Sequence, residues 1–163
     1  AIVISPSEKL LEVIAEQLPI KLAQQKRQPI ISEAISSRGA LIKVKDLNEA
    51  FEIVNKIAPE HLQLAIEAPE VWLPNVQHAG AVFLGVDTAE VVGDYTAGPS
   101  HVLPTSGTAR FASPLGVYDF QTRTSIIQCS REGAVKLSRA AAILASEEGL
   151  YAHAESALAR VKG

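Results

Sequence analysis

The sequence predicts an α/β protein, in which helices cover an incomplete, mostly parallel, Rossmann-like sheet and a helical tail follows. In the first half, short and nearly unbroken apolar runs alternate with segments of helical spacing, as expected of parallel strands buried on both faces. Beyond Cys129 the chain becomes rich in Ala, Leu, Arg and Glu and keeps only the helical spacing. We therefore predict an α/β domain over 1–113 and a helical tail over 114–163.

The first strand and helix follow directly from the residue types. Residues 1–5 are an apolar strand, after which Ser5 can cap a helix, Pro6 suits its first turn and Glu8 lies three residues on. Pro19 should kink or end this helix, because proline lacks an amide donor. A buried strand with no initiator methionine before it leads us to expect that the chain begins inside a longer polypeptide.

The next elements repeat this order. A less regular helix is expected over 29–37, and a strand over 40–44. Asp46, with Glu49 three residues later, opens a further helix that ends before Pro59. Its apolar stripe consists of Leu47, Ala50, Phe51, Val54 and Ile57.

Three short elements and a long loop complete the α/β part. We expect a strand over 62–66, a helix over 69–78 and a strand over 81–84. Between residues 87 and 114, glycines and prolines interrupt any period, which predicts a long ordered loop or a functional one. In the tail, apolar residues on both sides of Gly149 predict two helices whose apolar face needs a neighbouring domain or subunit.

Composition narrows the class of partner. The formal net charge is -3, and the scattered Lys and Arg argue against a nucleic-acid surface. No run approaches the roughly 20 apolar residues of a membrane span. The single Cys129 excludes an internal disulfide framework and fits a reducing compartment, so we expect a cytoplasmic or plastid-stromal protein that acts on small molecules.

Candidate chemistry rests on histidines and carboxylates, because the sequence has no dinucleotide fingerprint, P-loop, paired-cysteine zinc motif or GxSxG elbow. Glu60 and His61 adjoin in the turn between a helix and a strand, where both side chains could line one pocket. Such a pair could activate water and accept a proton. An exposed turn with a helix-end histidine is the alternative.

Two further pairs lie downstream. Asp94 and His101 share the loop GDYTAGPSH, and both residue types are good zinc ligands; a turn-forming aspartate and a hydrogen-bonded histidine are the alternative. Glu148 and His153 would stand roughly 140° apart on a continuous helix, so they share a site only if Gly149 ends it. Otherwise they are solvated surface residues.

Taken together and in order, these segments resemble the histidinol dehydrogenase family. The resemblance rests on APEHL at 58–62, GAVFLG at 80–85, the block from GDY to HVLPT at 93–105, and the pair Glu148 and His153. It covers essentially the whole chain, and the block at 93–105 is its most specific part.

The resemblance implies an enzyme that converts L-histidinol to L-histidine through L-histidinaldehyde by two NAD-dependent oxidations, the last steps of histidine biosynthesis. It implies that Glu60 activates water and that His61 is the proton acceptor. It further implies a zinc ion that holds the substrate, with Asp94 and His153 as ligands. The substrate-side residues would be His61, Asp94, His101, Glu148 and His153, and the residues that bind NAD are not identified.

The resemblance also implies what lies outside this chain. Two further zinc ligands, a glutamine and a histidine, and most of the NAD-binding domain precede Ala1 in the family. We therefore expect the chain alone neither to bind zinc well nor to oxidise histidinol. The family is a homodimer whose tails cross over, so that Glu148 and His153 would complete the partner's site. Ser100 departs from the family pattern, which more often has asparagine there.

Two alternatives stay open. A non-catalytic dimerisation or assembly module derived from this family would carry the same motifs, and metal or activity in the full-length protein would argue against it. A zinc or NAD enzyme on the same scaffold could oxidise another amino alcohol, and a screen of substrates without an imidazole would distinguish it.

Overall fold

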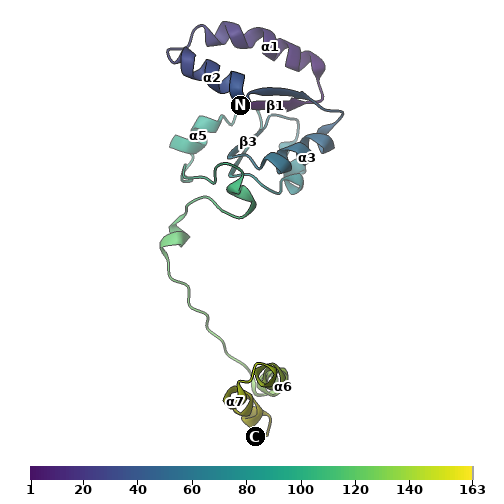
Figure 1. Cartoon of the computed structure of the whole chain (residues 1–163), viewed down its shortest axis with the longest axis vertical. Helices are drawn as coiled ribbons and strands as arrows, with labels where there is room; N and C mark the ends of the chain where they lie inside the picture. Colours follow the sequence, from purple (N-terminus) through teal and green to yellow (C-terminus); the bar gives the residue numbers. More distant parts are fainter. Residues whose placement is uncertain (163) are drawn as a thin grey trace. The chain divides into compact units, whose positions relative to one another are not determined.

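The structure, a computed structural model, describes residues 1–162 and separates into two compact units, Ala1–Phe120 and Gln121–Gly163. The first unit contains the strands and the helices around them, and the second contains two long helices (Figure 1). The predicted α/β class with a helical C-terminal region is confirmed. The boundary between the two units along the sequence follows Phe120, whereas the predicted boundary follows residue 113. The functional division into domains stays a prediction.

The strands pair in parallel, in two separate sheets. β1 (Ile2–Ser5) pairs with β2 (Ala40–Lys43), and β3 (His61–Leu64) pairs with β4 (Ala81–Leu84). Within the second sheet His61 lies opposite Ala81. The facing edges of β1 and β3 share no ladder and instead line an apolar cavity of about 700 Å³. Parallel pairing is therefore confirmed, although the strands do not join into one continuous sheet.

The N-cap of the first helix, α1 (Glu8–Leu22), lies two residues later than the Ser5 that the sequence suggested. Ser7 is the N-cap, since its Oγ accepts from the Leu10 amide at 3.2 Å. Ser5 instead accepts from the Ser7 amide at 3.0 Å and orders the preceding turn. Pro19 does not end the helix, which continues to Leu22. The Pro19 carbonyl accepts from the Ala23 amide at 3.1 Å, so the last turn of the helix keeps its hydrogen bond although proline itself has no amide donor.

The central packing joins α3 (Leu47–Ile57) to the second sheet. α2 (Gln28–Arg38) precedes it, and Asp46 caps α3 as predicted, accepting from the Glu49 amide at 3.0 Å. The buried apolar cluster of this unit joins two residues of α3 to two of β3, namely Phe51, Val54, Leu62 and Leu64. This packing fixes the strand whose first residue is His61.

The segment between β3 and β4 is less helical than expected. α4 (Pro69–Trp72) continues only as the 3-10 turn η1 (Leu73–Asn75), not to residue 78. Asn55 explains the early end, because its side chain accepts from the Gln77 amide at 2.8 Å and donates to the Asn75 carbonyl at 2.8 Å. β3 also begins one residue earlier and ends two residues earlier than the predicted strand over 62–66.

The predicted loop over 87–114 contains a helix. α5 (Glu90–Tyr95) forms one and a half turns and is closed by the Thr96 amide, which donates to the Val92 carbonyl at 3.0 Å. Two 3-10 turns follow, η2 (Thr108–Arg110) and η3 (Val117–Phe120). A helix this short has no hydrophobic period that the sequence could reveal.

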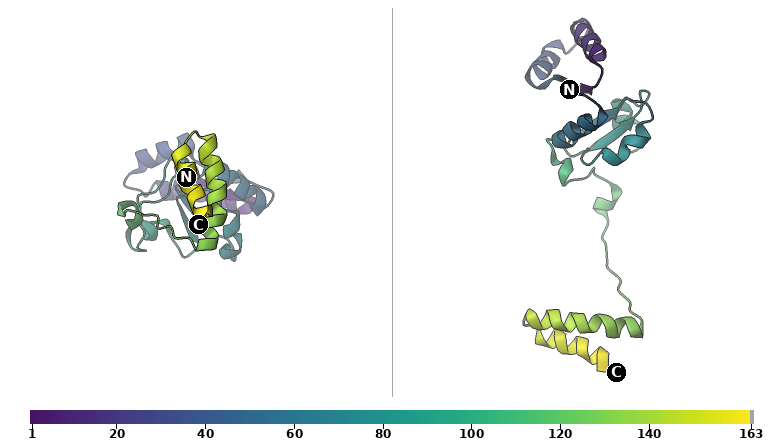
Figure 2. Two further views of the ribbon diagram at one scale, coloured as in Figure 1. Left: turned by 90° about the horizontal axis from the view of Figure 1, so that it is seen from below. Right: turned by 90° about the vertical axis from the view of Figure 1, so that its right-hand side faces the viewer.

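The second unit is a helical hairpin. α6 (Arg131–Glu147) is capped by Ser130, which accepts from the Gly133 amide at 3.1 Å, and α7 (Tyr151–Lys162) packs beside it (Figure 2). Gly149 adopts a left-handed φ of 74° in the turn that separates them, so both predicted tail helices are present. Residues 121–130 contain neither helix nor strand, and Cys129 is exposed among them.

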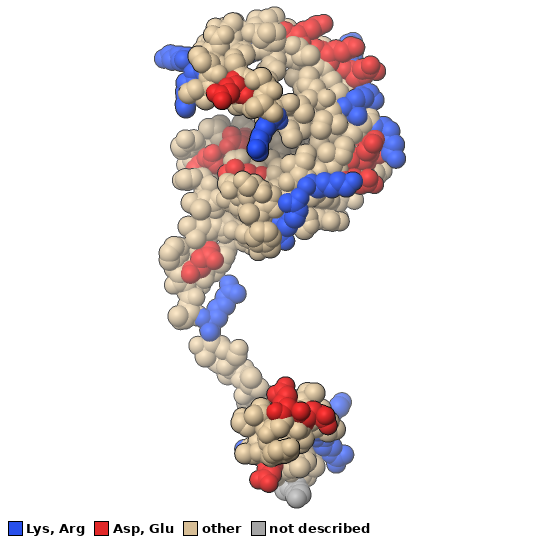
Figure 3. Space-filling model, viewed as in Figure 1, with Lys and Arg blue, Asp and Glu red and all other residues tan. Residues whose placement is uncertain are grey.

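The surface carries charges of both signs. On the face in view in Figure 3, Lys and Arg side chains are interspersed with Asp and Glu rather than collected in one patch. Among residues 1–162, no helix combines the length and the apolar character needed to cross a membrane.

Candidate active site

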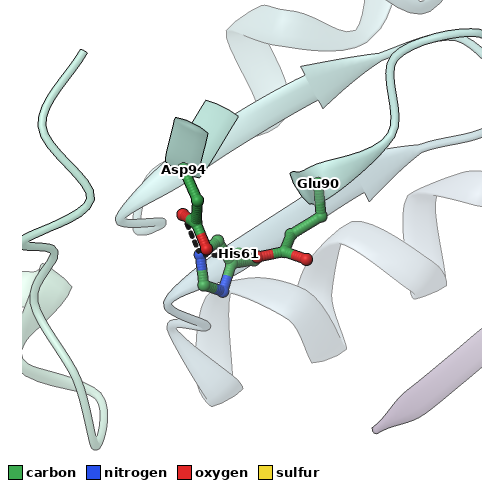
Figure 4. A group of neighbouring side chains, drawn as sticks. All are labelled: His61, Glu90 and Asp94. Carbon is green, nitrogen blue, oxygen red and sulfur yellow. Dashed lines mark ion pairs between the residues drawn. The ribbon is translucent and has the colours of Figure 1, made fainter. Parts of the chain in front are cut away.

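The geometric centre of the site is the imidazole of His61, the first residue of β3. Its Nε2 lies 3.3 Å from Glu90 Oε1 and 3.5 Å from Asp94 Oδ1 (Figure 4). Glu90 and Asp94 are four residues apart on α5, so one turn of helix presents both carboxylates to the same side. The structure therefore brings two predicted site residues, His61 and Asp94, into contact and adds a third.

The environment of this group is half-buried. The side chains of His61 and Asp94 are 29% and 28% exposed, and that of Glu90 is 45% exposed. The Nε2 atom of His61 is itself buried and has no aligned hydrogen-bond partner among the described residues. The two contacts are thus ion-pair contacts with poor hydrogen-bond alignment, and a buried polar nitrogen in that state lacks a partner that a bound ion or substrate would provide.

Phe83 and Gly93 set the distance between α5 and the sheet. The Phe83 ring lies beside His61, with centroids 5.9 Å apart and planes inclined by 41°. A Cβ at position 93 would come within 2.5 Å of the Phe83 Cε1 atom. Only glycine lets the helix approach the ring this closely, and this approach carries Glu90 and Asp94 to His61.

The turn that carries Glu60 and His61 is held from both sides. Ala58 ends α3 in the left-handed conformation and is fully buried. The Glu60 carbonyl accepts from the Ala81 amide at 2.8 Å, which ties the turn to the start of β4. From the other side, the Arg110 guanidinium donates to the Lys56 carbonyl near the end of α3. Glu60 is thereby fixed through its backbone, and its side chain makes no hydrogen bond or ion pair with the described residues.

The cavity beside β1 and β3 brings polar groups to an apolar wall. Glu60, His61 and Glu90 line it together with apolar side chains of β1, α3 and β3. A small molecule in this space would meet a carboxylate and an imidazole on one side and hydrocarbon on the other, which is the usual composition of a ligand pocket.

The other predicted residues lie outside this group. His101 is exposed in the segment between α5 and η2. Glu148 is the C-cap of α6 and His153 lies in the first turn of α7, both with exposed side chains in the second unit. Their predicted roles stay predictions.

Sequence reasoning missed Glu90. The residue stands four positions before Asp94, a spacing that places two side chains on one face of a helix. That spacing carries information only once residues 90–95 are known to be helical, and the glycines and prolines that follow them had predicted a loop.

The three side chains fit a divalent metal ion. One donor atom from each of His61, Glu90 and Asp94 lies within 4.8 Å of the other two. One imidazole nitrogen with two carboxylate oxygens is a donor set that zinc accepts, and the partnerless Nε2 agrees with such use. The three side chains could therefore bind a cation together, or one of them could bind a cation that other residues also hold.

Comparison with known proteins shows what this chain is similar to. A sequence model of the histidinol dehydrogenase family matches residues 1–161. The histidinol dehydrogenase of Pseudomonas fluorescens is 55% identical over 161 residues, which cover 99% of this chain and 36% of that protein. The histidinol dehydrogenase of Nitrosospira multiformis is 56% identical over 157 residues, covering 96% of this chain and 36% of that protein.

The same likeness holds in three dimensions. The crystal structure of histidinol dehydrogenase from Elizabethkingia anophelis matches with a TM-score of 0.88 at 31% sequence identity. The match covers 99% of this chain and 37% of that one. The chain spans about 36% of the length of the curated relatives it matches.

Proposed function

Because the chain belongs to the histidinol dehydrogenase family, as its motifs predicted, we propose that it forms part of an enzyme that oxidises L-histidinol to L-histidine through L-histidinaldehyde. The observation that best supports this activity is the His61 imidazole, which lines a cavity and stands between two carboxylates. Each oxidation of the substrate carbon releases a hydride and a proton. The hydride goes to NAD when that cofactor is bound, and the chain's own residues manage the protons.

His61 is the proton acceptor in this proposal. In the first oxidation the primary alcohol loses a proton from oxygen to the imidazole as the carbon loses hydride, and an aldehyde results. In the second, the hydrated aldehyde gives up a proton and a hydride in the same way, and a carboxylic acid results. The carboxylates of Glu90 and Asp94 lie beside the imidazole that takes up these protons.

Glu60 makes the water step possible. Its side chain is free of hydrogen bonds with the described residues and lines the same cavity as His61. It can therefore accept a proton from the water whose oxygen attacks the aldehyde carbon, which produces the hydrate. Counted over both oxidations, one alcohol, one water and two NAD+ give one carboxylate, two NADH and three protons.

Zinc is the proposed metal, with Asp94 and His153 among its ligands. When bound, the ion would hold the imidazole and the amine of the substrate in position and would take no part in the redox step. Asp94 belongs to a group of neighbouring donor atoms close enough together for a cation to bind among or beside them, which supports its proposed role as a ligand. His101 and Glu148 complete the proposed substrate contacts.

The second unit has its proposed role at a dimer interface. Its two helices and the turn between them leave several large apolar side chains exposed, namely Leu137, Ile143, Leu144, Leu150 and Tyr151. We propose a homodimer in which Glu148 and His153 reach the site of the partner subunit. The apolar surface would then be covered by the partner. The cytoplasm, or the plastid stroma, is the proposed location.

The first test compares this 163-residue chain with a protein extended upstream to the length of its relatives. Zinc content and histidinol-dependent NADH formation are measured on both. We expect zinc binding and activity only in the extended protein, because two protein ligands rarely hold zinc tightly. Full activity of the short chain would require a different zinc site and would remove the ligand assignment.

The second test separates this function from oxidation of another amino alcohol. The extended protein is assayed with histidinol and with amino alcohols that lack the imidazole ring. A site built to bind that ring should reject the analogues by a factor of about 10⁴, since its polar groups would stay unpaired. Comparable rates with both kinds of substrate would contradict the proposal.

A further inference from the structure

We propose that Glu90 is a positioning residue for His61, and that its carboxylate holds the imidazole while Asp94 is engaged by the metal. The inference rests on the proposed function, because it concerns the residue that accepts the protons. The known motifs do not contain Glu90. Its place beside His61 follows from the geometry of α5.

His61 faces two carboxylates with the same atom. Nε2 lies 3.3 Å from Glu90 and 3.5 Å from Asp94, so each carboxylate could hold the ring. An aspartate that binds a divalent cation directs its oxygens and its charge toward that cation. The carboxylate of Glu90, the nearer of the two, is then the one left to hold His61.

Apart from the two carboxylates, few contacts restrain the imidazole ring of His61. Its aromatic neighbour is Phe83, whose plane is inclined by 41° and whose contact does not fix rotation of the imidazole about its own axis. No described residue gives Nε2 an aligned hydrogen bond. Without the Glu90 contact, the imidazole could turn and move the reacting nitrogen, and misplacement by about 1 Å costs on the order of 100-fold in rate.

The two acids differ in their surroundings. Glu90 lines the apolar cavity together with His61, whereas Asp94 does not line it and is the less exposed of the two. Asp94 is thus placed as a metal ligand close to the protein surface. Glu90 is placed to contact the imidazole from the side of the cavity.

The experiment uses the zinc-loaded, full-length protein and the variants Glu90→Gln and Glu90→Asp. Asp87→Asn is the matched control, since Asp87 is an exposed acid that precedes α5. Readouts are kcat, KM for histidinol, zinc per subunit, and the rate at which diethylpyrocarbonate modifies His61 in the zinc-loaded protein. Mass spectrometry of the peptides separates His61 from the other histidines.

Glu90→Gln should lower kcat about 10- to 100-fold with little change in KM, because the loss concerns alignment in the reaction rather than binding. Zinc content should stay unchanged. His61 should be modified about fivefold faster than in the parent protein, because the ring loses a partly buried ion-pair contact that restrains it. Glu90→Asp keeps the charge and should recover part of the kcat, and Asp87→Asn should match the parent.

Two results would overturn the inference. Loss of zinc in Glu90→Gln would make Glu90 a metal ligand, and an unchanged kcat and modification rate would leave it no role at His61. If Glu90→Gln fails to fold, the kcat and modification rate of Glu90→Asp decide, and values equal to the parent reject the inference. Failure of the proposed function has a different appearance, because the parent protein would then not oxidise histidinol while the modification rates still report on Glu90.

Discussion

At the residue scale, the contacts that His61 makes with its two acids depend on a glycine in α5. Gly93 lets α5 lie against the Phe83 ring, and the ring in turn lies beside the imidazole. The same helix carries both acids of the site. Packing at position 93 and chemistry at position 61 are therefore coupled through one buried aromatic side chain.

The variant Gly93→Ala should be both less stable and less active. The new methyl group would come within 2.5 Å of Phe83, and overpacking of this kind costs about 1–3 kcal/mol. Urea unfolding and histidinol oxidation by the full-length protein measure the two effects. The double variant Gly93→Ala with Phe83→Leu gives back the space and should regain part of the stability. An equally stable single variant would show that the close approach has no cost.

Replacement of His61 itself tests the proton acceptor. His61→Asn should lower kcat by about 10²- to 10⁴-fold, the usual contribution of a positioned base, while zinc content remains that of the parent. His78→Asn is a matched control, because His78 is also partly buried but belongs to a different surface. A His61 variant with near-normal kcat would require another base.

The sequence identified some of these residues for a physical reason. His61 and Asp94 have side chains whose chemistry is specific, so they were candidates before any contact was known. Glu90 is one of many acidic residues in the chain, and only the turn of α5 distinguishes it. Phe83 and Gly93 appeared only as part of a motif, because their effect lies in a contact between segments.

At the element scale, α3 shows how local sequence fixes a structure that the site needs. Asp46 accepts from the Glu49 amide at 3.0 Å, and the Glu49 carboxylate accepts from the Lys45 amide at 2.7 Å. The first bond satisfies an amide of the first helical turn, and the second ties the residue before the cap to the helix. The helix they begin ends in the buried turn that presents Glu60 and His61.

Removing this cap should weaken the first unit. Asp46→Ala should lower the free energy of unfolding by about 1 kcal/mol, whereas Asp46→Asn should be nearly neutral because asparagine caps helices equally well. Denaturant titration of the full-length protein followed by circular dichroism compares the two. Similar losses in both variants would assign the effect to charge rather than to the cap.

Element boundaries were predictable where local chemistry decides them. β2 and β4 follow from apolar runs, and the start of α3 follows from its cap. The end of α4 was not predictable, because the side chain of Asn55 from another helix takes over the hydrogen bonds at Asn75 and Gln77. Pro19 likewise lies inside α1, three residues before the end of the helix.

At the scale of the whole molecule, residues with a proposed role occur in each of the two units. His61 belongs to the first unit and His153 to the second. The sequence predicted the α/β class and the helical tail from periodicity alone. Periodicity does not reveal which subunit's tail serves which site, because the same apolar face would cover a neighbour in either arrangement.

Mixing two inactive variants tests the proposed exchange between subunits. His61→Asn and His153→Asn proteins are combined, allowed to exchange subunits, and assayed. If each site joins two chains, half of the dimers are mixed and each contains one intact site, so about a quarter of the parent activity should return. If each site uses one chain only, every site carries a substitution and no activity returns. Zinc content of the His153→Asn protein alone should fall below that of the parent.

The single thiol of the chain has a practical consequence for such work. Cys129 is exposed in residues 121–130, directly before the cap of α6. A nitroxide or a fluorescent dye attached there would leave every proposed catalytic residue untouched. Since the label would sit at the entrance to the helical hairpin, its rotational mobility would register whether that hairpin tumbles freely or is held, which makes docking of the tail observable in real time.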